Sequence, residues 1–267
     1  GNTGYEVDMV GSLLLACKLI LQERLNEFVN NQILWIKQCK EDPKKSTILL
    51  PFSKFPAFID QIKEFSGDKR FECVDETLQK IGRELMSWLQ IVASQNEKYR
   101  NVVLIQNLEF LVECLSVRSD VKILRRLSIQ ANELKSEAER RYIEWMVSYE
   151  FPSYTQLADR IKELGKRATT DEIGLYVRRE DVSRAVSRMD KKTLELSIGN
   201  LKKRLEKHFN GYYEVSGLNI VPRLWEEICD DLCRVFKVIQ TIATSSYQIT
   251  LMVDETTVRS ICEKGNI

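Results

Sequence analysis

Apolar side chains recur at intervals of three and four residues along nearly the whole chain, and this spacing constrains the fold more than any other feature. One such series runs through Val10, Leu14, Cys17, Leu21, Leu25 and Phe28. This spacing puts the apolar side chains on one face of an α-helix. Proline and glycine are sparse and lie mainly between the periodic segments. The sequence therefore predicts long helices joined by short loops, without the alternation of strands and helices that a mixed fold requires.

The predicted fold class is all-α, with long antiparallel helices packed in bundles. The most regular segment runs from Leu124 to Tyr149, and its apolar side chains are about 3.5 residues apart, as they are in long bundles. Pro152 is expected to end this segment. A chain of 267 residues can hold two domains. We predict a first helical bundle at residues 1–150 and a second, C-terminal helical bundle at residues 151–267.

The overall composition excludes several classes of protein. The formal net charge is only +1, so the chain as a whole is not a strongly basic nucleic-acid binder. Its seven cysteines are odd in number and contain no CxxC pair, which fits reduced thiols in the cytosol. No apolar run is long enough to span a membrane or resembles a signal peptide, so we expect a soluble chain. The helical pattern starts almost at once, so we expect a fragment of a longer protein.

The only histidine, His208, lies in the stretch Leu194–Phe209, which Asp190 is expected to cap and Asn210-Gly211 to end. With 100° per residue, His208 falls within about 40° of Leu194, at the edge of an apolar stripe. The other members of that stripe are Ile198, Leu201 and Leu205. A single histidine in this position is usually a boundary residue of the core. A catalytic histidine would need partners that the sequence does not provide.

Two other patterns could indicate metal chemistry. Cys229 and Cys233 are one helical turn apart, but a zinc site would need further ligands, so packing explains them better. The segment DDLCR, Asp230 to Arg234, resembles the start of a magnesium-binding motif of all-α prenyl-transfer enzymes. Arg234 occupies the position where that motif needs another aspartate. The sequence also has no phosphate-binding loop, no HExxH and no nucleophile elbow. We therefore predict no catalytic residue, no metal and no cofactor.

Charge is distributed unevenly along the second half of the chain. The segment from Lys162 to Lys207 contains thirteen lysines and arginines and eight acidic residues. The segment from Phe209 to Ile267 contains five lysines and arginines and eight acidic residues. The interpretations are a solvated helix face, a surface for an acidic partner or an anionic membrane, and, third, a site for single-stranded nucleic acid. The candidate protein-partner or phospholipid surface comprises Arg184, Arg188, Lys192, Leu196, Lys203 and Lys207.

A family resemblance is carried by YVRREDVSRAVSRMDKKTLELSIGNLKKRLEKHF, from Tyr176 to Phe209. This segment resembles the closing part of exocyst complex component one, the Sec-three subunit, in which a short helix leads into a longer one rich in lysine. ILLPFSKFPAFID (48–60), RLWEEICDDLCRVFKVI (223–239) and QITLMVDETTVRSI (248–261) resemble other segments of that family in the same order. The family has a Pro-Gly turn where this chain has Met189-Asp190.

The resemblance implies a non-enzymatic, structural subunit of the exocyst, the complex that holds secretory vesicles at the plasma membrane before fusion. It also implies an elongated rod of stacked antiparallel helical bundles. The expected partners are other exocyst subunits, with small GTPases or anionic phospholipids reached only through the full-length protein, and no nucleic acid. The expected location is cytoplasmic and peripheral at sites of secretion. The alternative is an all-α enzyme or nucleic-acid-binding adaptor of unknown type.

Overall fold

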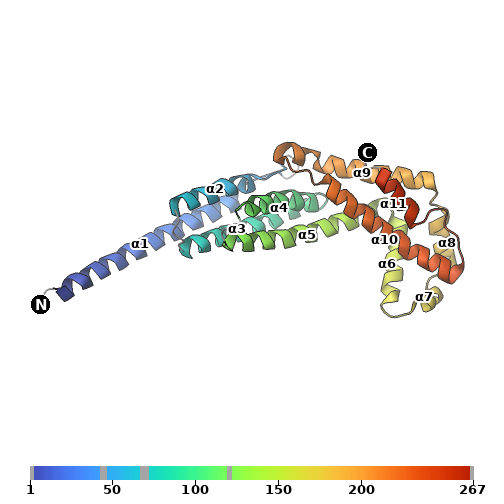
Figure 1. Cartoon of the computed structure of the whole chain (residues 1–267), viewed down its shortest axis with the longest axis horizontal. Helices are drawn as coiled ribbons and strands as arrows, with labels where there is room; N and C mark the ends of the chain where they lie inside the picture. The colour runs from blue at the N-terminus through green and yellow to red at the C-terminus, as the bar shows by residue number, and fades with distance from the viewer. Residues whose placement is uncertain (1–2, 43–46, 67–71, 119–121, 265–267) are drawn as a thin grey trace. The chain divides into compact units, whose positions relative to one another are not determined.

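The computed structural model describes residues 3–42, 47–66, 72–118 and 122–264. It contains the helices α1 (Thr3–Gln38), α2 (Leu50–Ser66), α3 (Glu72–Ser94), α4 (Arg100–Ser116), α5 (Lys122–Glu150), α6 (Pro152–Gly165), α7 (Thr170–Tyr176), α8 (Arg179–Ser187), α9 (Lys191–Ser216), α10 (Val221–Tyr247) and α11 (Glu255–Lys264) (Figure 1). No strand occurs within the described residues. The predicted all-α class is therefore confirmed.

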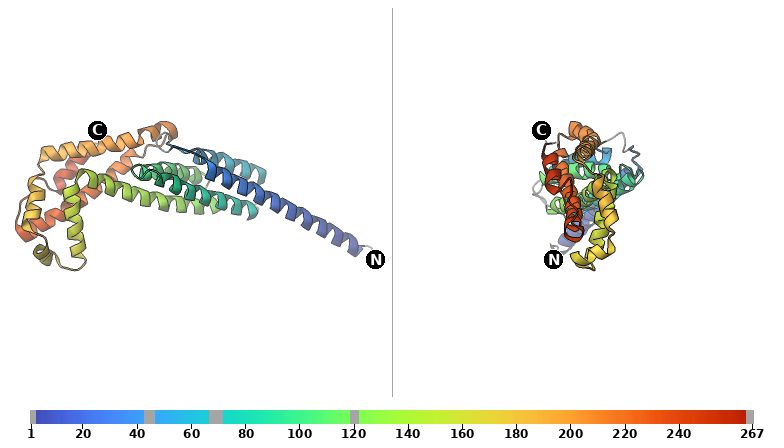
Figure 2. Two further views of the ribbon diagram at one scale, coloured as in Figure 1. Left: turned by 180° about the vertical axis from the view of Figure 1, so that it is seen from behind. Right: turned by 90° about the vertical axis from the view of Figure 1, so that its right-hand side faces the viewer.

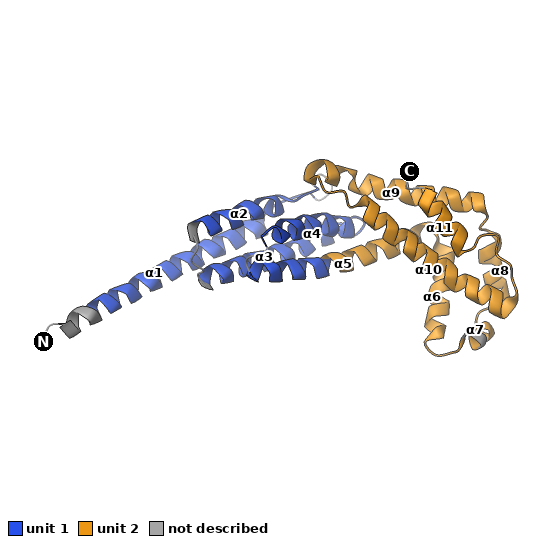
Figure 3. Ribbon diagram, in the orientation of Figure 1, with its two compact units in different colours: residues 1–134 blue, residues 135–267 orange. Residues whose placement is uncertain are grey.

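Internal contacts divide the chain into two compact units, residues 1–134 and 135–267 (Figure 3). The division falls inside α5, so one helix contributes residues to both units. The domain boundary predicted near Pro152 stays a prediction, as does the rod. Pro152 begins α6, where a proline is tolerated because the first amide of a helix needs no intrahelical partner.

Unit 1 packs the second half of α1 with α2, α3, α4 and the start of α5. Helix α3 contacts α1, α2 and α4. The core is formed by fully buried apolar side chains, among them Phe52, Ile59, Leu85, Leu89, Ile105 and Leu124. A buried amide joins the loop before α2 to α4, since Asn107 Oδ1 accepts a hydrogen bond from the Leu49 amide at 2.9 Å. The same side chain donates to the Thr47 carbonyl at 3.1 Å.

Helix α1 departs from the prediction in its first half. The sequence pattern predicted a buried face along Val10, Leu14 and Leu21, yet these side chains are 53–69 % exposed. Farther along the same helix, Val29 and Ile36 are 3 % exposed. The periodic pattern predicted the helix correctly. It could not predict that the neighbouring helices of unit 1 cover only the second half of α1.

Unit 2 is built around α10, which contacts α6, α7, α8, α9 and α11. Figure 2 shows the chain from behind. The core includes Trp225, Ile228 and Phe236 of α10, each at most 2 % exposed. Phe236 stacks on Tyr154 of α6 with the ring centroids 4.5 Å apart. Asp254 caps helix α11, because Asp254 Oδ1 accepts a hydrogen bond from the Thr257 amide at 2.8 Å.

An ion pair joins Arg118, just after the end of α4, to Asp60 of α2. The Arg118 guanidinium donates to both carboxylate oxygens of Asp60, at 2.7 and 2.5 Å, and this hydrogen bonding lowers the pKa of Asp60. Because the folded state depresses that pKa, the stabilisation is present above the unfolded value near 3.9 and is lost as the pH falls below it. We expect Arg118→Gln to lower the free energy of unfolding by up to about 1 kcal/mol at pH 7.

The measurement is denaturant unfolding of both proteins at pH 7 and at about pH 2. Part of the difference should persist in acid, because Arg118 Nη1 also donates to the Cys114 carbonyl at 2.7 Å. A difference that is equal at the two pH values would show that the Asp60 carboxylate contributes nothing.

Candidate partner surface

Helix α9 carries most of the candidate surface, and its two ends have clear local causes. Asp190 caps the N-terminus, as predicted, by accepting a hydrogen bond from the Thr193 amide at 2.7 Å. That hydrogen bond lowers the pKa of Asp190. The predicted end at Asn210-Gly211 is wrong, because α9 continues to Ser216 and ends at Gly217, whose φ is 72°. A glycine inside a helix costs only about 1 kcal/mol, which burial of the next tyrosine, Tyr212, can outweigh.

The inner face of α9 is the one predicted from the sequence. Leu194, Ile198, Leu201 and Leu205 are each 0–3 % exposed. His208 lies at the edge of this face, half-buried.

His208 is surrounded by aromatic side chains of α5. Its Nδ1 lies 2.9 Å from the Tyr142 hydroxyl oxygen, and its ring stacks on Trp145 with centroids 6.1 Å apart. Burial raises the pKa of Tyr142, so its hydroxyl stays protonated and can donate to the imidazole. The histidine thus has a packing and hydrogen-bonding role between α5 and α9.

The outer face of α9, which we call the α9 back, comprises Lys192, Leu196, Lys203 and Lys207. All four side chains are exposed, and Leu196 is 67 % exposed. In the described part of the chain, none of the three lysines forms an ion pair. The positions run for about 22 Å along the helix, at 1.5 Å per residue. The α9 back is therefore a line of exposed positive charge with one large apolar side chain in it.

The two arginines of the candidate set lie elsewhere. Arg184 and Arg188 line a hollow between α6, α8 and the start of α9, and α9 contributes Thr193 and Ser197 to it. On a helical wheel, Thr193 and Ser197 are roughly a fifth and a third of a turn from the mean direction of the α9 back. Arg184 also pairs with Asp181 at 4.0 Å. The structure thus brings four of the six residues together and places the arginines at a separate hollow.

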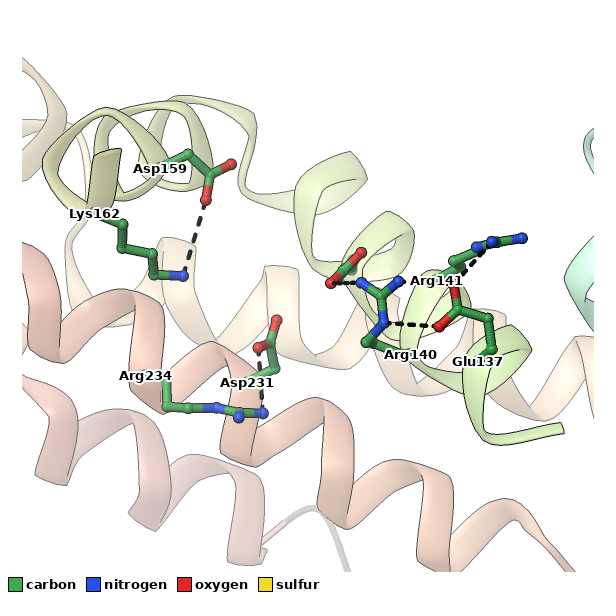
Figure 4. A network of polar contacts seen from close by, with 8 residues as sticks. Glu137, Arg140, Arg141, Asp159, Lys162, Asp231 and Arg234 are labelled. Carbon is green, nitrogen blue, oxygen red and sulfur yellow. Dashed lines mark hydrogen bonds and ion pairs between the residues drawn. The ribbon is translucent and has the colours of Figure 1, made fainter. Parts of the chain in front are cut away.

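The aspartates of DDLCR are each paired with an arginine. Asp231 pairs with Arg234 at 3.3 Å (Figure 4), and Asp230 pairs with Arg259 of α11 at the same distance. Burial raises the pKa of Asp231. Charged side chains on the surface of α5 are also paired, since Arg140 forms ion pairs with Glu137 and Glu144. These are ordinary stabilising ion pairs of helix surfaces.

Three cysteines gather between α10 and α11. Cys233 and Cys262 are 2 % and 3 % exposed, and Cys229 lines the same hollow. Burial raises the pKa of Cys233 to about 11, so its thiol is protonated at neutral pH. Within the described residues, no group of three or more histidine, cysteine or acidic side chains is placed to hold a metal ion. No sequence pattern indicated that Cys262 lies beside the other two, because 28 residues separate it from Cys233.

Among the described residues, none of the helices combines the length and the apolar composition that a membrane span requires.

The chain is similar to known proteins along most of its length. The sequence profile of the family described as "Exocyst complex component Sec3, C-terminal" matches residues 8–248. The chain is 21% identical over 206 residues to "Exocyst complex component SEC3A" of Arabidopsis thaliana. That alignment covers 76% of this chain and 22% of the plant protein, so the chain spans about a fifth of that relative's length. No solved structure matches the chain.

Proposed function

Because the chain belongs to the family of C-terminal regions of the exocyst component Sec3, we propose that it is a structural part of an exocyst subunit. In this role it helps to hold secretory vesicles at the plasma membrane before fusion. It acts through contacts with other exocyst subunits and not through catalysis. Small GTPases and anionic phospholipids are reached through the remainder of the full-length protein, and the location is cytoplasmic and peripheral at sites of secretion.

The observation that carries the proposal is the family match over residues 8–248. The structure supports it with two helical units whose helices have buried inner faces and exposed outer faces. Such units offer lateral surfaces for other subunits and need no active-site cleft. The experiment is replacement of the full-length protein in the source cells by a version lacking the segment that matches residues 8–248. Accumulation of secretory vesicles near the plasma membrane would support the proposal, and normal secretion would contradict it.

The α9 back is the surface that we propose for one of these contacts. An exposed leucine among lysines suits a protein partner, because the apolar atoms add affinity while the charges steer an acidic surface into place. A membrane would use the charges alone, at about 1 kcal/mol for each lysine near an anionic surface. We therefore favour an acidic face of another exocyst subunit, with lipid second.

Reversing the charge of the α9 back should weaken this contact. We expect Lys203→Glu with Lys207→Glu to raise the Kd for the other exocyst subunits at least tenfold, with folding unchanged because both side chains are exposed. Isothermal titration at physiological salt measures the Kd, and circular dichroism checks folding. The matched control is Arg125→Glu with Arg126→Glu, which makes the same charge change on the exposed face of α5.

Two further results separate the alternatives. Leu196→Ala should weaken a protein contact but barely change binding to anionic vesicles. If the reversed variant keeps its affinity for subunits and loses only vesicle binding, the surface binds lipid. If both affinities survive, the α9 back is only solvated.

A further inference from the structure

Helices α10 and α11 bring two cysteines together. Trp225 and Cys229 are one turn apart on α10, so they share one face of that helix. The Trp225 indole Nε1 donates a hydrogen bond to the Cys262 carbonyl of α11 at 3.4 Å. Arg259 of α11, one turn before Cys262, pairs with Asp230 of α10 at 3.3 Å. These two contacts, one at Trp225 and one next to Cys229, set Cys262 beside Cys229.

The two thiols differ in reactivity because of this arrangement. The Cys229 thiol is close enough to the Cys262 sulfur to donate a hydrogen bond to it, and that bond lowers the pKa of Cys262. The positive charge of Arg259 acts in the same direction. The same hydrogen bond raises the pKa of Cys229. Since the thiolate is the nucleophilic form, Cys262 is the more reactive sulfur, with a protonated thiol next to it.

A hollow in unit 2 gives small molecules access to the pair. It measures about 900 Å³, and both cysteines line it. Cys229 is half-buried, whereas Cys262 is 3 % exposed. A water molecule takes up about 30 Å³, so the hollow admits molecules as small as hydrogen peroxide or a simple thiol.

The third cysteine of the hollow, Cys233, is a poorer partner for Cys229. The two lie four residues apart on α10, where Cβ atoms are about 5–6 Å apart. A disulfide needs Cβ atoms about 3.5–4.5 Å apart. Burial also raises the pKa of Cys233 to about 11. Cys262 lies on a different helix, so the spacing within one helix does not keep it away from Cys229.

We propose that Cys229 and Cys262 form a reversible disulfide when the chain meets a peroxide, and that this bond fixes α11 on α10. The Cys262 thiolate attacks one peroxide oxygen, the O–O bond breaks, and a sulfenic acid forms with release of water. The Cys229 sulfur then attacks the Cys262 sulfur, the S–O bond breaks, and a second water leaves. The two sulfur atoms lose two electrons and two protons, which the peroxide takes up.

The bond is a modification and not a permanent part of the fold. In a reducing compartment the pair stays as thiols until an oxidant arrives, and two equivalents of a small thiol restore it afterwards. While it lasts, the bond closes the chain between α10 and α11 and removes open states in which the ten-residue α11 leaves the core. This inference does not depend on the proposed function.

The first test identifies the bond. The folded chain is treated with a small molar excess of hydrogen peroxide, digested without reduction and analysed by mass spectrometry. We expect a peptide pair linked through Cys229 and Cys262, which dithiothreitol separates, while Cys233 stays a thiol. A pair that remains reduced, or a bond from Cys229 to any other cysteine, would overturn the proposal.

The same reaction in dilute urea tests whether the folded state reacts. The rate of linkage should stay constant at urea concentrations below the unfolding transition, because the fold sets the two sulfurs side by side. A rate that rises in proportion to the unfolded fraction would show that only unfolded chains react, and the proposal would fail.

Substitutions test the role of each sulfur. Cys229→Ser removes the second thiol, so the Cys262 sulfenic acid should persist and its labelling by dimedone should rise at least tenfold over wild type. Cys262→Ser should leave Cys229 unlabelled. The matched control is Cys233→Ser, which replaces a neighbouring cysteine of the same hollow and should keep the linkage. Absence of dimedone on Cys262 in the first variant, with an intact fold by circular dichroism, would contradict the assignment.

Hydrogen exchange tests the effect on α11. After peroxide treatment, the slowest amides of α11 should exchange at least tenfold more slowly, and dithiothreitol should restore the original rates. Cys262→Ser should show no response to peroxide. Equal exchange of the oxidised and reduced wild-type chains would show that the bond does not fix α11 on α10.

Discussion

Leu205→Ala should lower the free energy of unfolding by roughly 2–5 kcal/mol, the usual loss for a leucine truncated inside a packed core. Leu205 is 0 % exposed on the inner face of α9. Removing its isobutyl group loses apolar burial and leaves a cavity that rigid helices on either side cannot fill. Chemical denaturation followed by circular dichroism measures the change, and Leu201→Ala, also at 0 % exposure, should behave alike.

The control for this prediction is the same substitution on the same helix. Leu196→Ala removes an identical group from a side chain that is 67 % exposed on the α9 back. It should change the free energy of unfolding by no more than about 0.5 kcal/mol. If Leu196→Ala destabilised the protein as much as Leu205→Ala, the assignment of inner and outer faces of α9 would be wrong.

Asn107→Ala should be the second strongly destabilising change, at roughly 2–4 kcal/mol, because each buried polar group left without a partner costs about 1–3 kcal/mol. The Asn107 side chain is fully buried and bonds the Leu49 amide and the Thr47 carbonyl at once. Alanine would leave both backbone groups unsatisfied next to the core of unit 1. Denaturant unfolding measures the loss, and hydrogen exchange of the Leu49 amide should become faster.

The matched control is Asn132→Ala, which removes an exposed asparagine side chain from α5 in the same unit. It should be nearly neutral, since water replaces any hydrogen bond that it makes. Equal effects of the two substitutions would show that Asn107 does not hold the loop before α2 in place.

The spacing of apolar residues in the sequence predicted the features that depend on local structure, namely which side chains share a helix face and where helices begin. The stripe from Leu194 to Leu205 is buried and His208 lies at its edge, because the 3.6-residue period alone decides which side chains share a face. Asp190 and Asp254 were predictable as caps because a short acidic side chain can bond the free amides of the first turn.

What the sequence could not predict depends on contacts between distant segments. Helix α9 continues beyond its predicted end at Gly211, because the buried side chain of Tyr212 extends the apolar stripe. The apolar periodicity of α1 could not predict that no other helix of unit 1 covers its first half. Arg184 and Arg188 were grouped with the lysines because they are close in sequence, whereas the packing of α8 directs them to a hollow beside α6. The charge pattern identified a basic region but not which charges are already paired.

The proposed function depends on whether this chain assembles with other exocyst subunits. The chain is mixed with the purified remaining subunits at physiological salt, and native mass spectrometry records the masses of the complexes. We expect a stable heteromeric complex that contains one copy of the chain and is weakened by Lys203→Glu with Lys207→Glu. A chain that stays monomeric with every subunit, while its circular dichroism shows the intact helical fold, would contradict it.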